Sequence, residues 1–296
     1  MRKRGVEVKL WSELLRHAPG PADATSVPGT LSEAVAAFKP HVLHFCAHMS
    51  PTDVEPFANK LLETGVPVTI RGHSIGFSVE HYRRLRDVER IWLFPHHAAQ
   101  IEQRNIESLS VSYDSALYYP ATPGRSVVRA GAAKAGKDLE GFLRVARLCA
   151  DVDFTLIVTG SDDDYLHELA VQAPKNVTLH RHVPPAATAA LVRQARVCLR
   201  GHDIQGHPYG MPISIAEALG AGLPIVARAG GPEKYVADAG MFYRTDEEAA
   251  AFVSDVMSWP AERWQEARAR SLARAQRFDA DLVLPRILYV WRHLTP

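Results

Sequence analysis

The chain has 296 residues, of which 47% are hydrophobic and 23% are charged, an ordinary composition for a soluble globular protein. A chain of this length is long for one hydrophobic core and suits two domains. The formal net charge of +1 excludes the strong positive field expected of a nucleic-acid-binding protein, so we expect no nucleic-acid partner.

Three cysteines lie far apart in apolar stretches, at Cys46, Cys149 and Cys198. This spacing argues against a disulfide framework and is typical of a reducing compartment, so we expect a cytoplasmic protein. No Cys/His set has the spacing of a structural zinc site, and no metal is expected. No apolar run reaches the roughly 18 residues that cross a bilayer. The opening MRKR is not followed by the apolar segment of a signal peptide.

Strands and helices are predicted to alternate through the first 113 residues. Strands are expected at 6–11, 41–47, 66–72, 90–95 and 108–113. Helices are expected at 31–38, 51–64, 78–88 and 96–104. Alternation at this spacing predicts a parallel α/β sheet.

A stretch rich in proline, glycine and serine, residues 116–126, predicts a linker before a second alternation. Strands are expected at 126–131, 154–160, 177–183, 197–201 and 223–227. Helices are expected at 138–149, 165–171, 186–194, 212–220, 246–258, 261–277 and 280–293. The fold class predicted is therefore α/β, with two Rossmann-like parallel-sheet domains.

Polar groups follow several of the predicted strands. Ligands of open α/β sheets bind at the carboxyl ends of the strands, and two such sheets create a cleft between those edges. Three candidates lie at strand ends: His73, the loop after Gly131 and the helix after Tyr209. For His73, a histidine that only caps the sheet edge is the alternative.

The loop GAAKAGKD, residues 131–138, follows a strand and opens a helix. Helix N–H groups there can cradle a phosphate, and Lys134 or Lys137 can reach it as a point charge. The alternative is a solvated surface loop. It is not a Walker loop, because Asp138 stands where that motif needs serine or threonine.

The run YGMPISIAEALGAGLPIVARAGGPEKYV, residues 209–236, predicts a loop, a short helix, a buried strand and a glycine turn. Pro212 suits the first turn of the helix, whose free N–H groups favour an anion such as a diphosphate. Glu217 is the only charge between Tyr209 and Arg228. It either points to water from an apolar helix or accepts hydrogen bonds from ligand hydroxyls.

Two further charged groups have simpler interpretations. The basic residues between Arg83 and Arg90 alternate with acidic ones and predict a solvated helix face; contact with anionic lipid or an anionic acceptor is the alternative. The acidic run 162–164 predicts a polar loop after a strand, since no second acidic cluster accompanies it.

Five segments together resemble the retaining, nucleotide-sugar-dependent glycosyltransferases of the GT-B fold, the glycogen-synthase and mannosyltransferase-like group of the family 4 type. They are KPHVLHF (39–45), VPVTIRGHS (66–74), YDSALYYP (113–120), GAAKAGK (131–137) and YGMPISIAEALGAGLPIVARAGG (209–231). The resemblance implies an N-terminal acceptor-side domain at 1–121, a nucleotide-sugar-binding domain at 122–279 and a terminal helix at 280–296 that crosses back. The opening RKRGVEV resembles the family's second strand, so the first domain is expected to be shortened.

The resemblance also implies a site. Lys137, Glu217 and His73 are expected to serve catalysis by stabilising the diphosphate, holding the ribose and contacting the sugar, without a metal or cofactor. The remaining donor-binding residues expected are Gly131, Lys134, Tyr209, Gly210, Met211, Pro212, Ile213, Ser214, Gly230, Gly231 and Glu233.

Two positions depart from the family pattern. Ala132 stands where the family has an arginine after the loop glycine, and Tyr209 stands where it has the first of two glutamates. The function expected is transfer of a sugar from a nucleoside diphosphate to an unidentified glycan, lipid or small-molecule acceptor, with retention. The alternatives are a non-catalytic relative that binds a nucleotide sugar or a partner protein, and a nucleotide-sugar epimerase.

Overall fold

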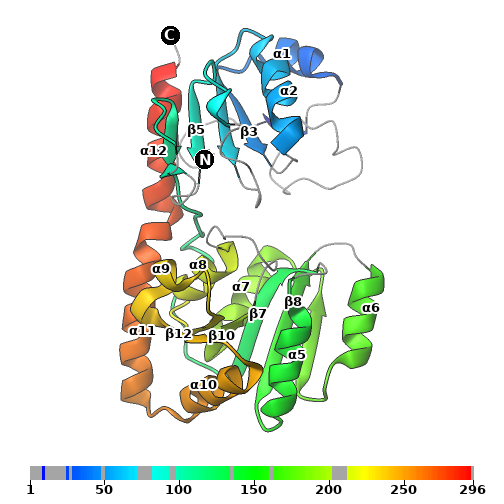
Figure 1. Ribbon diagram of the computed structural model, residues 1–296, viewed down its shortest axis with the longest axis vertical. Coiled ribbons are helices and arrows are strands. Elements are labelled where there is room, and N and C mark those ends of the chain that lie inside the picture. The colour runs from blue at the N-terminus through cyan, green and yellow to red at the C-terminus, as the bar shows by residue number, and fades with distance from the viewer. Residues whose placement is uncertain are drawn as a thin grey trace. The chain divides into compact units, whose positions relative to one another are not determined.

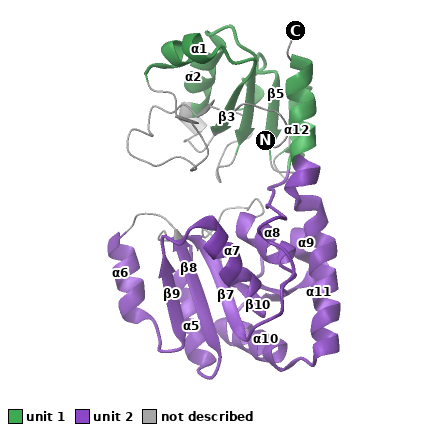
Figure 2. Cartoon of the chain, turned by 180° about the vertical axis from the view of Figure 1, so that it is seen from behind, with its two compact units in different colours: residues 1–109, 284–296 green, residues 110–283 purple. Residues whose placement is uncertain are grey.

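The computed structural model describes ten stretches of the chain, and every structural statement below concerns these. They are residues 9–10, 25–26, 29–47, 51–72, 82–93, 98–99, 101–133, 137–159, 163–201 and 212–294. The chain divides into two compact units (Figure 2). Unit 1 holds residues 1–109 and 284–296, and unit 2 holds residues 110–283.

Unit 2 is built on a six-stranded parallel sheet. Its strands are β7 (Ser126–Ala132), β8 (Asp153–Thr159), β9 (Val177–Arg181), β10 (Val197–Arg200), β11 (Ile225–Arg228) and β12 (Gly240–Tyr243). They lie in the order β12-β11-β10-β7-β8-β9. The chain runs outward from β7 to β9 and then returns to place β10 on the other side of β7. The strand order therefore reverses between β7 and β10.

Helices cover both faces of this sheet (Figure 1). They are α5 (Leu139–Leu148), α6 (Asp163–Gln172), α7 (Pro185–Arg193), α8 (Ile213–Gly220), α9 (Glu233–Val236), α10 (Asp246–Ser258) and α11 (Ala261–Ala275). Helix α5 packs against α10, while α7 packs against α8 and β7. Coverage on both faces explains why the central strands β10 and β11 are apolar runs instead of alternating patterns.

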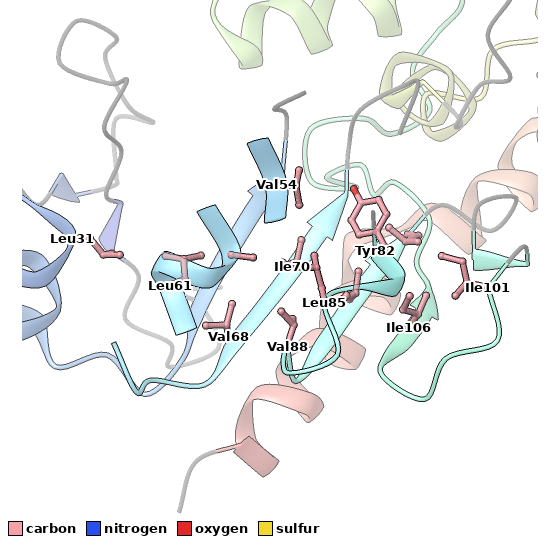
Figure 3. Close-up of a cluster of buried hydrophobic side chains, with 13 residues drawn as sticks. Leu31, Val54, Leu61, Val68, Ile70, Tyr82, Leu85, Val88, Ile101 and Ile106 are labelled. Carbon is pink, nitrogen blue, oxygen red and sulfur yellow. The ribbon is translucent and has the colours of Figure 1, made fainter. Parts of the chain in front are cut away.

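Unit 1 is built on a smaller parallel sheet. Its strands are β3 (Leu43–Ala47), β4 (Val68–Gly72), β5 (Arg90–Leu93) and β6 (Ile106–Ser108), in the order β3-β4-β5-β6. Helices α1 (Leu31–Phe38) and α2 (Pro51–Leu62) belong to this unit, and the short strands β1 (Lys9–Leu10) and β2 (Thr25–Ser26) pair separately. Figure 3 shows the buried cluster that α1, α2 and the sheet share with the segment around Tyr82.

The other face of the unit 1 sheet is polar and aromatic. His44 Nδ1 lies 3.0 Å from Thr69 Oγ1, and Trp291 Nε1 donates to the same oxygen at 3.1 Å. Trp291 belongs to α12 (Ala280–Leu294), so the end of the last helix packs on unit 1. Burial, with the nearby charge of Arg71, lowers the pKa of His44 to about 4.

Most predicted elements are present, with shifted ends, and a few are wrong in the described residues. Residues 84–88 form turns and bends, and residues 101–104 form no helix, although helices were predicted over both stretches. The Asn105 amide explains the first turn, because it donates to the carbonyl oxygens of Leu85 and Val88 at 3.0 and 2.6 Å. The strand expected at 108–113 ends at Ser108, and β12 was not predicted.

None of the helices in the described stretches combines the length and the apolar composition needed to cross a bilayer. Two surface arginines of unit 1 pair with acids: Arg84 with Glu55 at 3.5 Å and Arg90 with Glu107 at 2.6 Å. Both therefore lie on a mixed-charge surface.

Candidate functional site

The candidate site lies in unit 2, at the carboxyl ends of β7 and β10. The strand order of the sheet reverses between these two strands, and a crevice forms outside the strand ends at such a reversal. The loop after β7 carries Lys137, and the segment after β10 leads into α8, which contacts β7. Two of the three candidates named from the sequence therefore belong to unit 2.

Arg129, a buried residue of β7 itself, anchors the loop that follows this strand. This side chain is 1% exposed, and one guanidinium nitrogen donates to the carbonyl oxygen of Asp138 at 2.8 Å. The other donates to the carbonyl oxygen of Lys137. Asp138 precedes α5 in a left-handed conformation with φ of 51° and pairs with Arg144 at 3.6 Å. The backbone that presents half-buried Lys137 is thus held from two sides.

A second buried arginine lies beside the first residues of the same loop. Arg200, at the end of β10, is 7% exposed, and its Nη1 donates to Ala130 O at 3.1 Å. A methyl group added at Gly131 would lie 3.2 Å from that nitrogen. The absence of a side chain at Gly131 therefore lets the loop backbone lie close to a positive charge.

Glu217 is half-buried on α8. Burial raises the pKa of its carboxyl group, and a hydrogen bond from the Tyr118 hydroxyl and the charge of Arg200 offset part of that rise. The half-burial of Glu217 and its raised pKa argue against the interpretation in which this side chain points to water from a solvated helix face.

Helix α8 begins with no side-chain cap. Pro212 occupies the N-cap position with φ of −62° and ψ of 136°, and it has no side-chain oxygen to accept from the first turn. Ile213 is 53% exposed and Ser214 is half-buried. The N–H groups at this end give the helix a positive end that suits an anion.

The glycine turn after β11 already holds an anion of its own. The amides of Gly230 and Gly231 donate to the Glu233 carboxylate at 2.6 and 2.7 Å. Burial alone would raise the pKa of Glu233, but these hydrogen bonds and the charge of Arg244 lower it overall. A diphosphate would therefore reach these two amides only by displacing Glu233.

Five of the residues expected in the site lie outside the described residues. They are His73, Lys134, Tyr209, Gly210 and Met211. Gly131 lies near the end of β7 and Lys137 in the loop after it, while Pro212, Ile213, Ser214 and Glu217 belong to the start and the body of α8.

Three contributors to the site were missed at the sequence level: Arg129, Arg200 and Tyr118. Each arginine is the one charge inside an otherwise apolar strand, SVVRAGA or VCLR. This pattern is a sequence signal for a site, since a buried cation requires partners. Tyr118 lies in the segment compared with the family, but its effect on the pKa of Glu217 links residues far apart in the chain.

This fold and site define a class. The two parallel-sheet units have the architecture of GT-B glycosyltransferases. Residues 124–259, which contain the whole strand reversal, match the family described as Glycosyl transferases group 1. A search of curated proteins finds no match.

Solved structures agree on the fold. TarM has a TM-score of 0.59 and 14% identity; the alignment covers 84% of this chain and 54% of TarM. A trehalose-phosphate synthase (UDP-forming) from Burkholderia xenovorans has a TM-score of 0.68 and 12% identity, covering 88% and 76%. A glycosyltransferase from Rickettsia africae has a TM-score of 0.65 and 11% identity, covering 92% and 85%. The chain thus spans about half the length of TarM.

Proposed function

We propose that this protein is a glycosyltransferase that binds a nucleoside-diphosphate sugar at the strand reversal of unit 2 and transfers the sugar with retention to a glycan, lipid or small-molecule acceptor. The observation that carries the proposal is that Lys137 follows β7 and Glu217 lies on α8, the helix that packs on β7. The group 1 match over residues 124–259 supports the same activity.

The proposed roles follow from charge and reach. Lys137 and the first amides of α8 stabilise the diphosphate as negative charge develops on it during departure, and Arg200 adds positive charge beside Gly131. Glu217 accepts hydrogen bonds from the ribose hydroxyls. We propose that these cations suffice without a metal or a cofactor, and that His73 and Tyr209 contact the sugar.

The test is a panel of UDP-, GDP-, ADP- and TDP-sugars, screened first by thermal shift and then by release of the nucleoside diphosphate. We expect one donor to bind and turn over. Lys137→Ala should lower turnover by roughly tenfold or more, because it removes a charge that acts mainly in the transition state.

The matched control is Lys175→Ala, which removes an exposed lysine from another loop of the same unit. It should leave turnover unchanged. Equal turnover by Lys137→Ala and the wild-type chain would overturn the assignment of the site.

A binding protein without transferase activity is the second candidate. Ala132 supplies no cation after the loop glycine, and Glu233 occupies the amides of Gly230 and Gly231. Calorimetric binding of a nucleoside diphosphate, with neither hydrolysis nor transfer of any donor in the panel, would favour this candidate.

A further inference from the structure

Asp138, the residue that follows Lys137, begins helix α5 in an unusual way. An aspartate at the N-cap normally has an extended backbone, and its carboxylate accepts from the first amides of the helix. Asp138 instead has φ of 51° and ψ of 43°, and its side chain makes no capping hydrogen bond. A left-handed conformation is strained for a residue with a side chain, and such strain persists only where surrounding contacts impose it.

The contacts that impose it include a slot between two glycines. A Cβ at Gly141, in the first turn of α5, would lie 2.5 Å from Asp138 Oδ1, and the three atoms nearest to it all belong to this carboxylate. A Cβ at Gly201, directly after β10, would lie 2.5 Å from Asp138 Oδ2 and 2.9 Å from Arg129 Nη1. The carboxylate therefore packs on the backbone of α5 and on the backbone at the end of β10.

Two arginines hold Asp138 from other sides. Arg144 Nη2 lies 3.6 Å from Asp138 Oδ1, and Arg144 Nε donates to Asp246, the first residue of α10, at 2.6 Å. Arg129 donates to the backbone carbonyl oxygens of Asp138 and Lys137. The Asp138 side chain is 19% exposed. Asp138 thus connects the loop that carries Lys137 with β10, α5 and α10.

We propose that Asp138 is a positioning residue for donor binding: its carboxylate, packed between Gly141 and Gly201, fixes the backbone that places Lys137 at the end of β7 for the diphosphate. This inference rests on the proposed function and adds a residue to it. Because Lys137 and Asp138 share a peptide bond, a rotation of the Asp138 backbone would turn Lys137 as well. A charge that is already in place loses less entropy on binding than one that must first be ordered.

The experiment is calorimetric titration of the full chain with UDP, GDP, ADP and dTDP at pH 7. Asp138→Gly removes the carboxylate and accepts the same left-handed conformation without strain, but it also permits many others. It should weaken the tightest of the four nucleotides by roughly tenfold. In a Lys137→Ala background it should weaken binding by less than about twofold, since the charge that it positions is gone.

A second variant reaches the carboxylate from α5. Gly141→Ala adds a methyl group that must displace the Asp138 carboxylate, so it should weaken the same nucleotide by roughly fivefold, and it should have no further effect in an Asp138→Gly background. The matched control is His182→Gly, which removes an exposed side chain with φ of 52° from another loop of unit 2 and should bind as the wild-type chain does. Thermal unfolding of each variant shows whether it is folded.

The outcomes distinguish this inference from the proposed function. If the wild-type chain binds none of the four nucleotides, or Lys137→Ala binds as tightly as the wild-type chain, the proposed site is overturned and the inference with it. If Lys137→Ala weakens binding but folded Asp138→Gly does not, only the positioning role is overturned. The same holds if Asp138→Gly costs as much affinity in the Lys137→Ala background as alone. Should Asp138→Gly fail to fold, unchanged binding by Gly141→Ala would overturn the positioning role.

Discussion

Replacing Arg129 by methionine should release the loop that presents Lys137. The guanidinium is 1% exposed and donates to the carbonyl oxygens of Lys137 and Asp138. A hydrogen bond to a charged group contributes roughly 1.5–3 kcal/mol, so losing two should lower the free energy of unfolding by about 3 to 6 kcal/mol. Methionine fills much of the same volume, so little of this loss comes from a cavity.

The assay combines urea denaturation with hydrogen exchange of the peptide 131–142, because two units need not unfold together. Arg129→Met should speed exchange in this peptide and weaken nucleoside-diphosphate binding. The control is Arg147→Met, which removes an exposed arginine that also donates to a carbonyl oxygen, Gln172 O. Surface changes of this kind usually cost under about 0.5 kcal/mol. Equal losses in the two variants, or unchanged exchange in 131–142, would refute the anchoring role.

Three other predictions concern stability. Glu217→Gln should raise the melting temperature at pH 7 while weakening nucleotide binding. Burial raises the pKa of Glu217 in the folded chain, so the stability that protonated Glu217 contributes is lost as pH rises above 4.5. The gain in melting temperature from the substitution should therefore vanish at lower pH. Asn176→Ala should lower the free energy of unfolding in urea by about 2 to 3 kcal/mol, since its amide lies 2.9 Å from three carbonyl oxygens; a loss below about 0.5 kcal/mol would contradict this. The pKa of His44 is lowered to about 4, so the wild-type chain should lose up to about 3 kcal/mol of unfolding free energy as pH falls from 6.5 towards 4. His44→Gln should flatten that pH dependence, and an equally steep loss in both chains would contradict the prediction.

The larger pattern of the fold could be predicted because buried parallel strands and their helices leave periodic apolar runs. The strands β7, β8, β10 and β11 were expected within a few residues of their ends. Prediction failed where tertiary contacts decide the backbone, as around Asn105, whose amide satisfies carbonyl oxygens that a continued helix would have used. Strand β12 is four residues long and, among the described strands, pairs with β11 at the edge of the sheet, so its pattern is too short to stand out.

The candidate site, like the fold, could be predicted from the sequence only in part. Lys137 and Glu217 could be named from local sequence, because a charge beside glycines at a strand end, or alone in an apolar helix, is visible there. The neighbours of these residues could not: Arg200 donates to the loop carbonyl oxygen of Ala130 across 70 residues of chain, and the Glu233 carboxylate accepts from the amides of Gly230 and Gly231. Long-range contacts of this kind leave no periodic signal.

The central claim is that a nucleoside diphosphate binds at the reversal between β7 and β10. A crystal structure of the chain with the tightest-binding nucleotide of the panel tests this most directly. We expect the diphosphate beside Lys137 and the first amides of α8, and a ribose hydroxyl within hydrogen-bond distance of Glu217. A nucleotide bound elsewhere, or one at this place whose ribose leaves Glu217 untouched, would contradict the account.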